Sequence, residues 1–227
     1  MHFLALLLVC LLMWCTPLRR ALPLDIPQLW VAFAERRVAH RPLVGLALLL
    51  VPLVPVALLQ AWLVTQGWGF LTLLFYVLVL LACMGRSDPL GRMTERFEAA
   101  LARGDVEAAA LVAEHEQGVV GRDSADVLAA MCAVLVREIL HGYVVTVFWF
   151  VLLGPVGALG YRLLRLRLAQ DAPAGEPVTA LTHALEWLPA RLLAASFALV
   201  GHFDHVRQVL ADALLSWDVS ADDLVAR

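Results

Sequence analysis

The chain lacks lysine altogether, so its seventeen basic residues are all arginines. Charge of either sign is scarce: charged residues make up 16% of the sequence, and the formal net charge is −3. Proteins that bind nucleic acid usually carry a basic patch, so we predict no nucleic-acid partner. The sequence also lacks a Walker A loop, a GxGxxG fingerprint and a GxSxG motif, so none of these motifs supplies catalytic residues.

Cysteines are few, and no two of them form a CxxC pair. The four are Cys10, Cys15, Cys83 and Cys132. Three lie in or beside apolar runs, so we expect free, buried thiols and no disulfide framework. His202 and His205 could share one helical face, but no second pair of ligands lies nearby in the sequence. We therefore predict no metal site and no cofactor.

Long apolar runs are abundant. Apolar residues make up 62% of the chain, and the mean hydropathy is +0.80. A soluble globular domain contains about 45–50% apolar residues, so this composition is typical of a membrane protein. We predict an all-α, polytopic helical membrane protein with a cytoplasmic helical insert and the lipid bilayer as a partner.

Residues 1–42 contain two short helical patterns. Phe3–Trp14 is apolar but shorter than the roughly twenty residues that span a bilayer, so we expect a short, uncleaved or half-inserted helix. Gln28–His40 is amphipathic, and we interpret it as an interfacial helix. The residues on its one side are Leu29, Ala32, Phe33 and Arg36.

Residues 43–84 read as a transmembrane hairpin. Leu43–Thr65 is long enough to span, and Pro52 and Pro55 would kink it. Residues 66–69 (QGWG) predict a tight turn, after which Phe70–Met84 returns as a second, shorter span. Both ends of this hairpin would lie on the same side of the membrane.

Residues 85–142 are the longest polar region and predict a cytoplasmic helical insert. Asp88-Pro89 favours the start of a helix, and Arg103-Gly104-Asp105 indicates a second helix boundary. A third helix would extend to Gly142 from a cap at Asp123 or Ser124. The six arginines of this region place it in the cytoplasm by the positive-inside rule.

Residues 143–227 combine a broken apolar segment with amphipathic helices. Gly154-Pro155 interrupts the run Tyr143–Leu164, which leaves a kinked span and a re-entrant segment as open alternatives. A full span would place the arginines at 162, 165 and 167 outside, against the positive-inside rule. The C-terminal residues from His202 to Arg227 are amphipathic, and we treat all four segments as one integrated domain.

The stretch from residue 183 to residue 202 carries the most informative polar residues. His183 and Glu186 are three apart, so a helix stacks them on one face. Arg191 stands at the mouth of the uncharged run Leu192–Val200, where a guanidinium needs a carboxylate, a phosphate or water. Glu186 is its nearest candidate partner in the sequence, and snorkelling to the lipid headgroups is the alternative.

Two stretches resemble a known superfamily, FWFVLLGPVGALGYR at Phe148–Arg162 and HALEWLPAR at His183–Arg191. The superfamily comprises AmpE, a regulatory inner-membrane protein linked to β-lactamase induction, and CobD/CbiB, the membrane-bound adenosylcobinamide-phosphate synthase. GDVEAA at residues 104–109 and GRDS at residues 121–124 extend the resemblance over most of the chain. The second of these looks like the GRDT stretch of the synthase.

The polar positions resemble AmpE more closely than the synthase. AmpE-like chains read H-x-x-[DE]-W-x-P-x-R-L and then L-x-G-H. The matching residues here are His183, Glu186, Trp187, Pro189, Arg191, Leu192, Leu199, Gly201 and His202. Of the acidic E-N-x-x-D-G pattern of the synthase only Gly142 is retained, with Arg137, Glu138 and His141 at the polar positions. A Mg-ATP site needs carboxylate oxygens, and Arg137 opposes one.

The resemblance implies a bacterial inner-membrane, multi-pass sensor or modulator without catalytic turnover. It would bind an anionic ligand or a regulatory protein partner at a polar cleft on the cytoplasmic side. The candidate binding residues are Arg122, Asp123, Glu138, His141, His183, Glu186 and Arg191.

Other interpretations remain open at this point. Arg122-Asp123 has a simpler interpretation as a turn and helix cap. The alternative function is an ATP-dependent, amide-forming synthase of cobalamin biosynthesis, and a third is a membrane scaffold without a ligand site. AmpE chains usually continue to another membrane helix, so the end at Arg227 predicts a shortened member or a truncated chain.

Overall fold

The computed structural model describes residues 2–15, 25–38, 42–84, 92–117, 123–170, 175–200 and 219–221. Within these ranges the regular elements are helices and no strand is present, which confirms the all-α prediction. The chain divides into two compact units. The first unit is Met1–Arg86 with Gly142–Pro189, and the second unit is Ser87–His141 with Ala190–Arg227.

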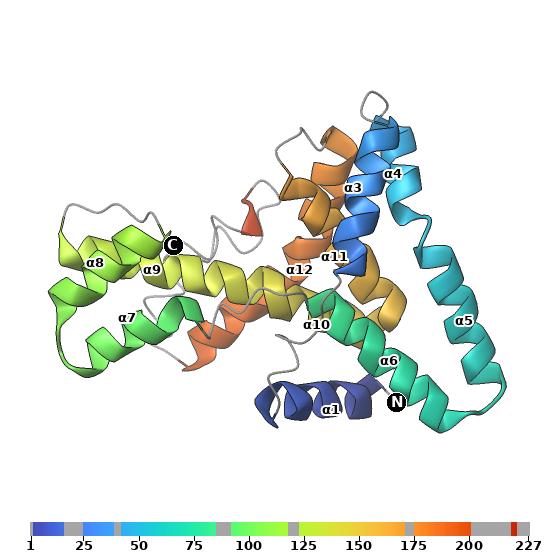
Figure 1. Ribbon diagram of the computed structural model, residues 1–227, viewed down its shortest axis with the longest axis horizontal. Coiled ribbons are helices and arrows are strands. Elements are labelled where there is room, and N and C mark those ends of the chain that lie inside the picture. The colour runs from blue at the N-terminus through green and yellow to red at the C-terminus, as the bar shows by residue number, and fades with distance from the viewer. Residues whose placement is uncertain are drawn as a thin grey trace. The chain divides into compact units, whose positions relative to one another are not determined.

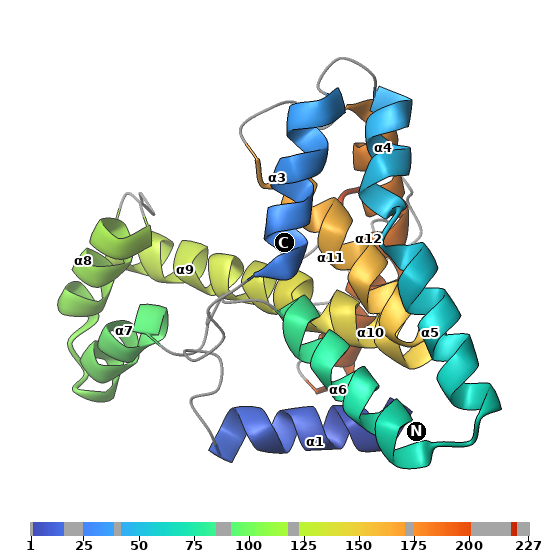
Figure 2. The same ribbon diagram turned by 45° about the vertical axis from the view of Figure 1, so that its right-hand side comes forward.

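The first unit is built from apolar helices that come from both halves of the sequence. They are α1 (His2–Cys15), α3 (Ile26–Val38), α4 (Pro42–Leu50), α5 (Leu53–Thr65), α6 (Gly69–Met84), α10 (Val145–Leu153), α11 (Pro155–Leu168) and the first part of α12 (Glu176–Val200). Helix α1 lies along α6, and α3 lies beside α4, in both views (Figures 1 and 2). The predicted helices near residues 3–14 and 28–40 are therefore present, except that 39 and 40 lie outside the described residues.

Two of the described helices are long and apolar enough to cross a membrane, Leu43–Thr65 and Ser124–Leu153. The first is the predicted first span, and it bends at Val51-Pro52, where α4 ends and α5 begins. The kink was predicted from its prolines, because Pro52 cannot donate a backbone hydrogen bond. The predicted return span is α6, which is shorter at 16 residues.

The second of these long helices crosses a boundary that the sequence suggested. Helix α9 (Ser124–Ile139) continues through a π-helical turn at Leu140–Val144 into α10. No loop therefore separates the predicted insert from the apolar segment that follows it. Such π turns form where one extra residue is inserted into a helix, and they often occur at functional sites.

The helix does break at Gly154, as its Gly-Pro pair predicted. Gly154 has φ of 70°, which favours glycine, and Pro155 then begins α11. A β-carbon at residue 154 would lie 3.0 Å from Nε2 of Gln60 and 3.1 Å from Nε2 of His2. One at Gly157 would lie 2.6 Å from the backbone oxygen of Trp149, so α11 packs on α10 at van der Waals contact.

The second unit contains a small helical layer with its own core. Its helices are α7 (Arg92–Ala102), α8 (Val106–Gln117), α9 and the last part of α12. The predicted boundary at Arg103-Gly104-Asp105 is confirmed: Gly104 has φ of 74°, and Asp105 Oδ1 accepts a hydrogen bond from Ala108 N at the start of α8. The buried core residues are Phe97, Ala100, Ala109, Ala110, Ala113, Val127 and Met131.

The cysteine prediction is confirmed in part. Cys10, Cys83 and Cys132 are free thiols, as expected, and Cys15 has no described side chain. Burial holds for Cys83 alone among these three, because Cys10 and Cys132 lie on the outer faces of their helices. The prediction of burial was wrong there because an apolar neighbourhood in sequence does not say which face of a helix points inward.

Candidate functional site

The polar residues of the first unit gather where the second half of α11 faces α12 and α3. The first half of α11 is apolar and packs on α10, whereas Arg162, Arg165 and Arg167 lie in its second half. Cations near the C-terminus of a helix interact favourably with the helix dipole. We call Tyr161, these three arginines and their acidic partners the α11 arginine cluster.

Glu186 is a buried acidic residue of this cluster. Glu186 is 8% exposed as a whole residue. Its Oε1 accepts a hydrogen bond of 2.8 Å from the hydroxyl of Tyr161, which is itself buried. Nη1 of Arg165 lies 4.0 Å from the same oxygen. A buried carboxylate needs such partners, because leaving one uncompensated is costly. Tyr161 and Arg165 are four residues apart, so α11 presents both on one face.

The other two arginines of the cluster have their own carboxylate partners. Nη2 of Arg162 lies 3.5 Å from Oδ2 of Asp25, and Nη1 of Arg167 lies 3.7 Å from Oε1 of Glu35. Each arginine of α11 is thus matched by its own acid, two from the α3 segment and one from α12, so three positive charges face three negative ones. Arg165 differs from the other two in its exposure: its side chain is 32% exposed, against 15% for each of them.

The part of α12 that carries Glu186 is fixed from two sides. Nε1 of Trp149 donates a 3.0 Å hydrogen bond to the backbone oxygen of Leu185, which holds α10 against α12. Thr182 is buried, and its hydroxyl donates to the oxygen of Val178 within the same helix. His183 is partly buried and has interactions of its own. The position of Glu186 is therefore set by packing.

Arg191 belongs to the second unit and is described with it. It is 6% exposed, and its Nη2 lies 3.4 Å from the backbone oxygen of Val219. Burial lowers the pKa of this guanidinium, although an arginine keeps its charge at physiological pH. Glu186 and His183 belong to the first unit, so a shared site of these residues with Arg191 stays a prediction.

Three further candidates lie on or before the long helix of α9 and α10. Glu138 is partly buried near the end of α9, and His141 is buried in the π-helical turn. Asp123 is the N-cap of α9, and its Oδ1 accepts a 2.8 Å hydrogen bond from Asp126 N. The cap interpretation of Asp123 is confirmed, and a ligand contact by it stays a prediction. Arg122 lies outside the described residues.

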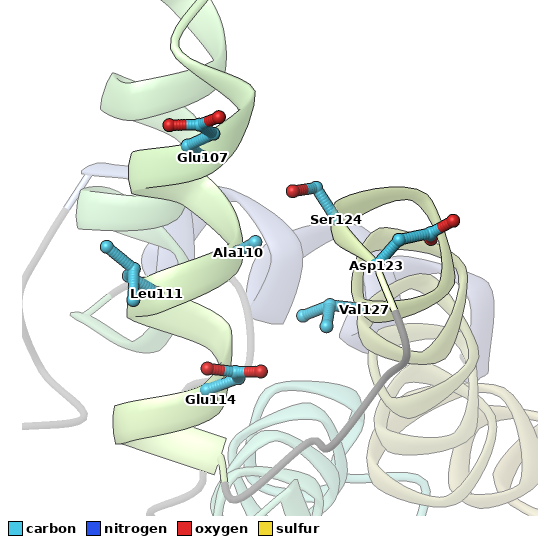
Figure 3. A pocket seen from close by; sticks show the side chains of 7 residues that line it. All are labelled: Glu107, Ala110, Leu111, Glu114, Asp123, Ser124 and Val127. Carbon is cyan, nitrogen blue, oxygen red and sulfur yellow. The ribbon is translucent and has the colours of Figure 1, made fainter.

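A groove of about 320 Å³ runs between α8 and α9 in the second unit. Figure 3 shows Ala110 facing Val127 across it, Glu107 and Glu114 on the α8 side, and the Asp123 carboxylate turned back along its own helix. Among the described residues no group of three or more His, Cys, Asp and Glu side chains is placed to hold a metal ion. The groove is acidic, so it is a poor site for an anion.

Sequence reasoning singled out Glu186 as a candidate but did not name Tyr161 and Arg165, which contact it. The four-residue spacing of Tyr161 and Arg165 on a helix was a usable signal, since it predicts two polar groups on one face. It did not indicate which carboxylate they meet, because Glu186 is 25 residues away from Tyr161 in the sequence.

Comparison with known proteins gives one match that covers nearly the whole chain. The sequence model of a family described as "Regulatory signalling modulator protein AmpE" matches residues 2–225. No curated protein and no solved structure matches the chain significantly. The AmpE part of the predicted resemblance is therefore confirmed, and nothing in these comparisons favours the cobalamin synthase.

Proposed function

The chain belongs to the AmpE family of regulatory signalling modulator proteins, and from this we propose that it is a membrane-bound modulator of β-lactamase induction. It would act in the bacterial inner membrane by binding an anionic ligand or a regulatory partner, without chemical turnover. The structural observation that supports the proposal most is the buried hydrogen bond from Tyr161 to Glu186, with the partly exposed Arg165 beside the same carboxylate.

The apolar surface of the first unit supports the membrane placement. In the candidate span Leu43–Thr65, only 6% of its apolar 18-residue stretch is buried inside the protein. Large apolar side chains of α5 and α6 point outward, among them Leu58, Phe70 and Leu78 at 67%, 76% and 57% exposure. Large exposed apolar surfaces are rare on soluble monomers, and contact with lipid chains would remove this one from water.

Arg165 is the best placed of the three cluster arginines to contact an anion. It is the most exposed, and at 4.0 Å from Glu186 it attracts the carboxylate without a short hydrogen bond. A guanidinium has five donors in a planar fork that matches a carboxylate or a phosphate. An incoming anion would therefore compete with Glu186 for Arg165, while the Tyr161 hydroxyl continues to satisfy Glu186.

This competition gives the protein two states that a ligand can bias. Without the anion, Arg165 and Glu186 hold α11 and α12 together through their charges. With it, that attraction is shared with the ligand, and the contact between the two helices weakens. A ligand shifts such an equilibrium only by its difference in affinity for the two states. Here the difference would come from Arg165, which is engaged by Glu186 in one state and by the anion in the other.

The test is genetic complementation in a host with an inducible β-lactamase. We expect deletion of the gene to alter β-lactamase activity after exposure to an inducer, and the wild-type chain to restore it. Arg165→Gln should fail to restore normal induction, whereas Arg165→Lys should restore it in part because it keeps the charge. The matched control is Arg103→Gln, an exposed arginine between α7 and α8.

Membrane abundance of each variant is measured in parallel by immunoblotting, so that loss of protein is not taken for loss of function. Unchanged induction after deletion contradicts the regulatory proposal. Normal induction with Arg165→Gln at wild-type abundance contradicts the assigned site and leaves the regulatory role intact.

A further inference from the structure

Helix α3 presents two apolar faces, and in the part of the chain that the structure describes one of them is buried and the other is exposed. Pro27, Val31 and Ala34 are buried against the first unit. On the opposite side a second stripe is exposed. It consists of Ile26, Leu29 and Phe33, at 69%, 58% and 43% exposure, followed by Arg36 and Arg37. With 3.6 residues per turn, these five residues fall within an arc of about 100°.

The charge on the exposed stripe is positive because the neighbouring acid is turned away from it. Oε1 of Glu35 lies 3.7 Å from Nη1 of Arg167, so this carboxylate is engaged by the α11 arginine cluster. Arg36 and Arg37 remain on the surface in the last turn of α3. The guanidinium carbon of Arg37 lies 5.0 Å from the centre of the Phe33 ring, which orients this cation directly beside the apolar stripe.

The stripe is continuous with the helix that begins the first candidate span. Helix α3 packs on α4, and Nε1 of Trp30 lies 3.3 Å from the backbone oxygen of Leu48 in α4. At the start of α4, Leu43 and Val44 are also exposed, at 70% and 48%. An apolar strip that leads into a span and ends in two cations has the chemistry of the lipid interface, where arginines reach the headgroups.

We propose that the exposed face of α3 binds anionic phospholipid headgroups through Arg36 and Arg37, with Ile26, Leu29 and Phe33 inserted among the acyl chains. The inference rests on the membrane placement proposed above and adds a preference among lipids. A basic residue beside an acidic leaflet contributes about 1 kcal/mol, so two of them correspond to a preference of roughly 30-fold at most over a zwitterionic lipid.

The test uses the full chain purified from bilayers that contain equal amounts of phosphatidylglycerol and phosphatidylcholine. The ratio of the two lipids that stay bound to the protein is measured by mass spectrometry. We expect enrichment of phosphatidylglycerol on the wild-type chain and a ratio near that of the bilayer for the double variant Arg36→Gln and Arg37→Gln. The double variant with lysine at both positions should keep the enrichment, because it keeps the charge.

Arg103→Gln serves as the control for loss of one exposed arginine elsewhere, and it should keep the wild-type ratio. Equal ratios for the wild type and the double glutamine variant overturn the proposal. So does displacement of bound phosphatidylglycerol by glycerol phosphate at equal concentration, since it would show a free-anion site without a role for the acyl chains. A double variant that changes the dimer fraction but not the lipid ratio also overturns it, in favour of a contact between copies.

Failure of the membrane placement itself is recognised separately. Release of the wild-type chain from membranes by alkaline carbonate would contradict the membrane placement under the proposed function. Retention of the chain in the membrane together with absent lipid enrichment contradicts only the inference about α3.

Discussion

The Tyr161 hydroxyl can be removed with little other change, and its removal tests the α11 arginine cluster directly. Tyr161→Phe deletes one oxygen from a buried side chain and keeps the ring that packs in the first unit. The oxygen that is lost donates the 2.8 Å hydrogen bond to Glu186. Glu186 would then keep its burial and lose this hydrogen bond.

The expected cost follows from the geometry. A hydrogen bond to a charged group contributes about 1.5–3 kcal/mol, and Nη1 of Arg165 at 4.0 Å is too distant to replace it without movement. For a chain of this size each kcal/mol lowers Tm by about 2–4 °C. We therefore expect Tyr161→Phe to lower Tm by about 3–12 °C.

The measurement is thermal unfolding of the purified full chain in detergent at one fixed heating rate, followed by tryptophan fluorescence. Tyr76→Phe is the matched control. Tyr76 is also buried in the first unit, but its hydroxyl makes no hydrogen bond in the part of the chain that the structure describes. Equal Tm changes for the two variants, or none for Tyr161→Phe, would refute the assigned role of the hydroxyl.

Two further predictions concern the helices. Gly157→Ala should lower the free energy of unfolding by about 1–3 kcal/mol, because the added β-carbon would clash with the Trp149 backbone oxygen. Gly142→Ala is the control and should be tolerated, because no described atom outside its own helical turn lies within 4 Å of its added β-carbon; the Tm of both variants is measured. Asp123→Ala should lower stability by about 1 kcal/mol through loss of the α9 cap to Asp126 N, and Asp123→Asn should not; equal Tm values for the two variants would contradict the cap.

Much of the local structure could be predicted from short-range patterns in the sequence. The Gly154-Pro155 break follows from the backbone demands of these two residues, and the caps at Asp105 and Asp123 follow from side chains that bond their own helix starts. Each of these features depends on a few neighbouring residues. The bend in Leu43–Thr65 belongs to the same class, because Pro52 acts on its own turn.

The candidate site could not be predicted in full, because it is formed by contacts between residues that lie far apart in the sequence. Proximity in sequence suggested Arg191 as a partner of Glu186, and this pairing stays a prediction. The structure brings two further partners, Tyr161 and Arg165, to this carboxylate from another helix, and their proximity was not visible in the sequence. Glu35 likewise meets Arg167, which is far along the chain. Charge alone does not select among seventeen arginines, so tertiary packing had to supply the pairing.

The core of the second unit has a consequence for how that unit opens. Among the described residues, this core cluster has seven buried members, and four of them are alanines, each of which contributes little more than a methyl group to burial. Phe97, Val127 and Met131 are its larger buried members, and the other large side chains that pack on it, such as Val112 and Leu128, are only partly buried. Local opening of α7 and α8 should therefore need little free energy, and their backbone amides should exchange rapidly with deuterated water. These two helices could then rearrange around a bound molecule while the rest of the chain stays folded.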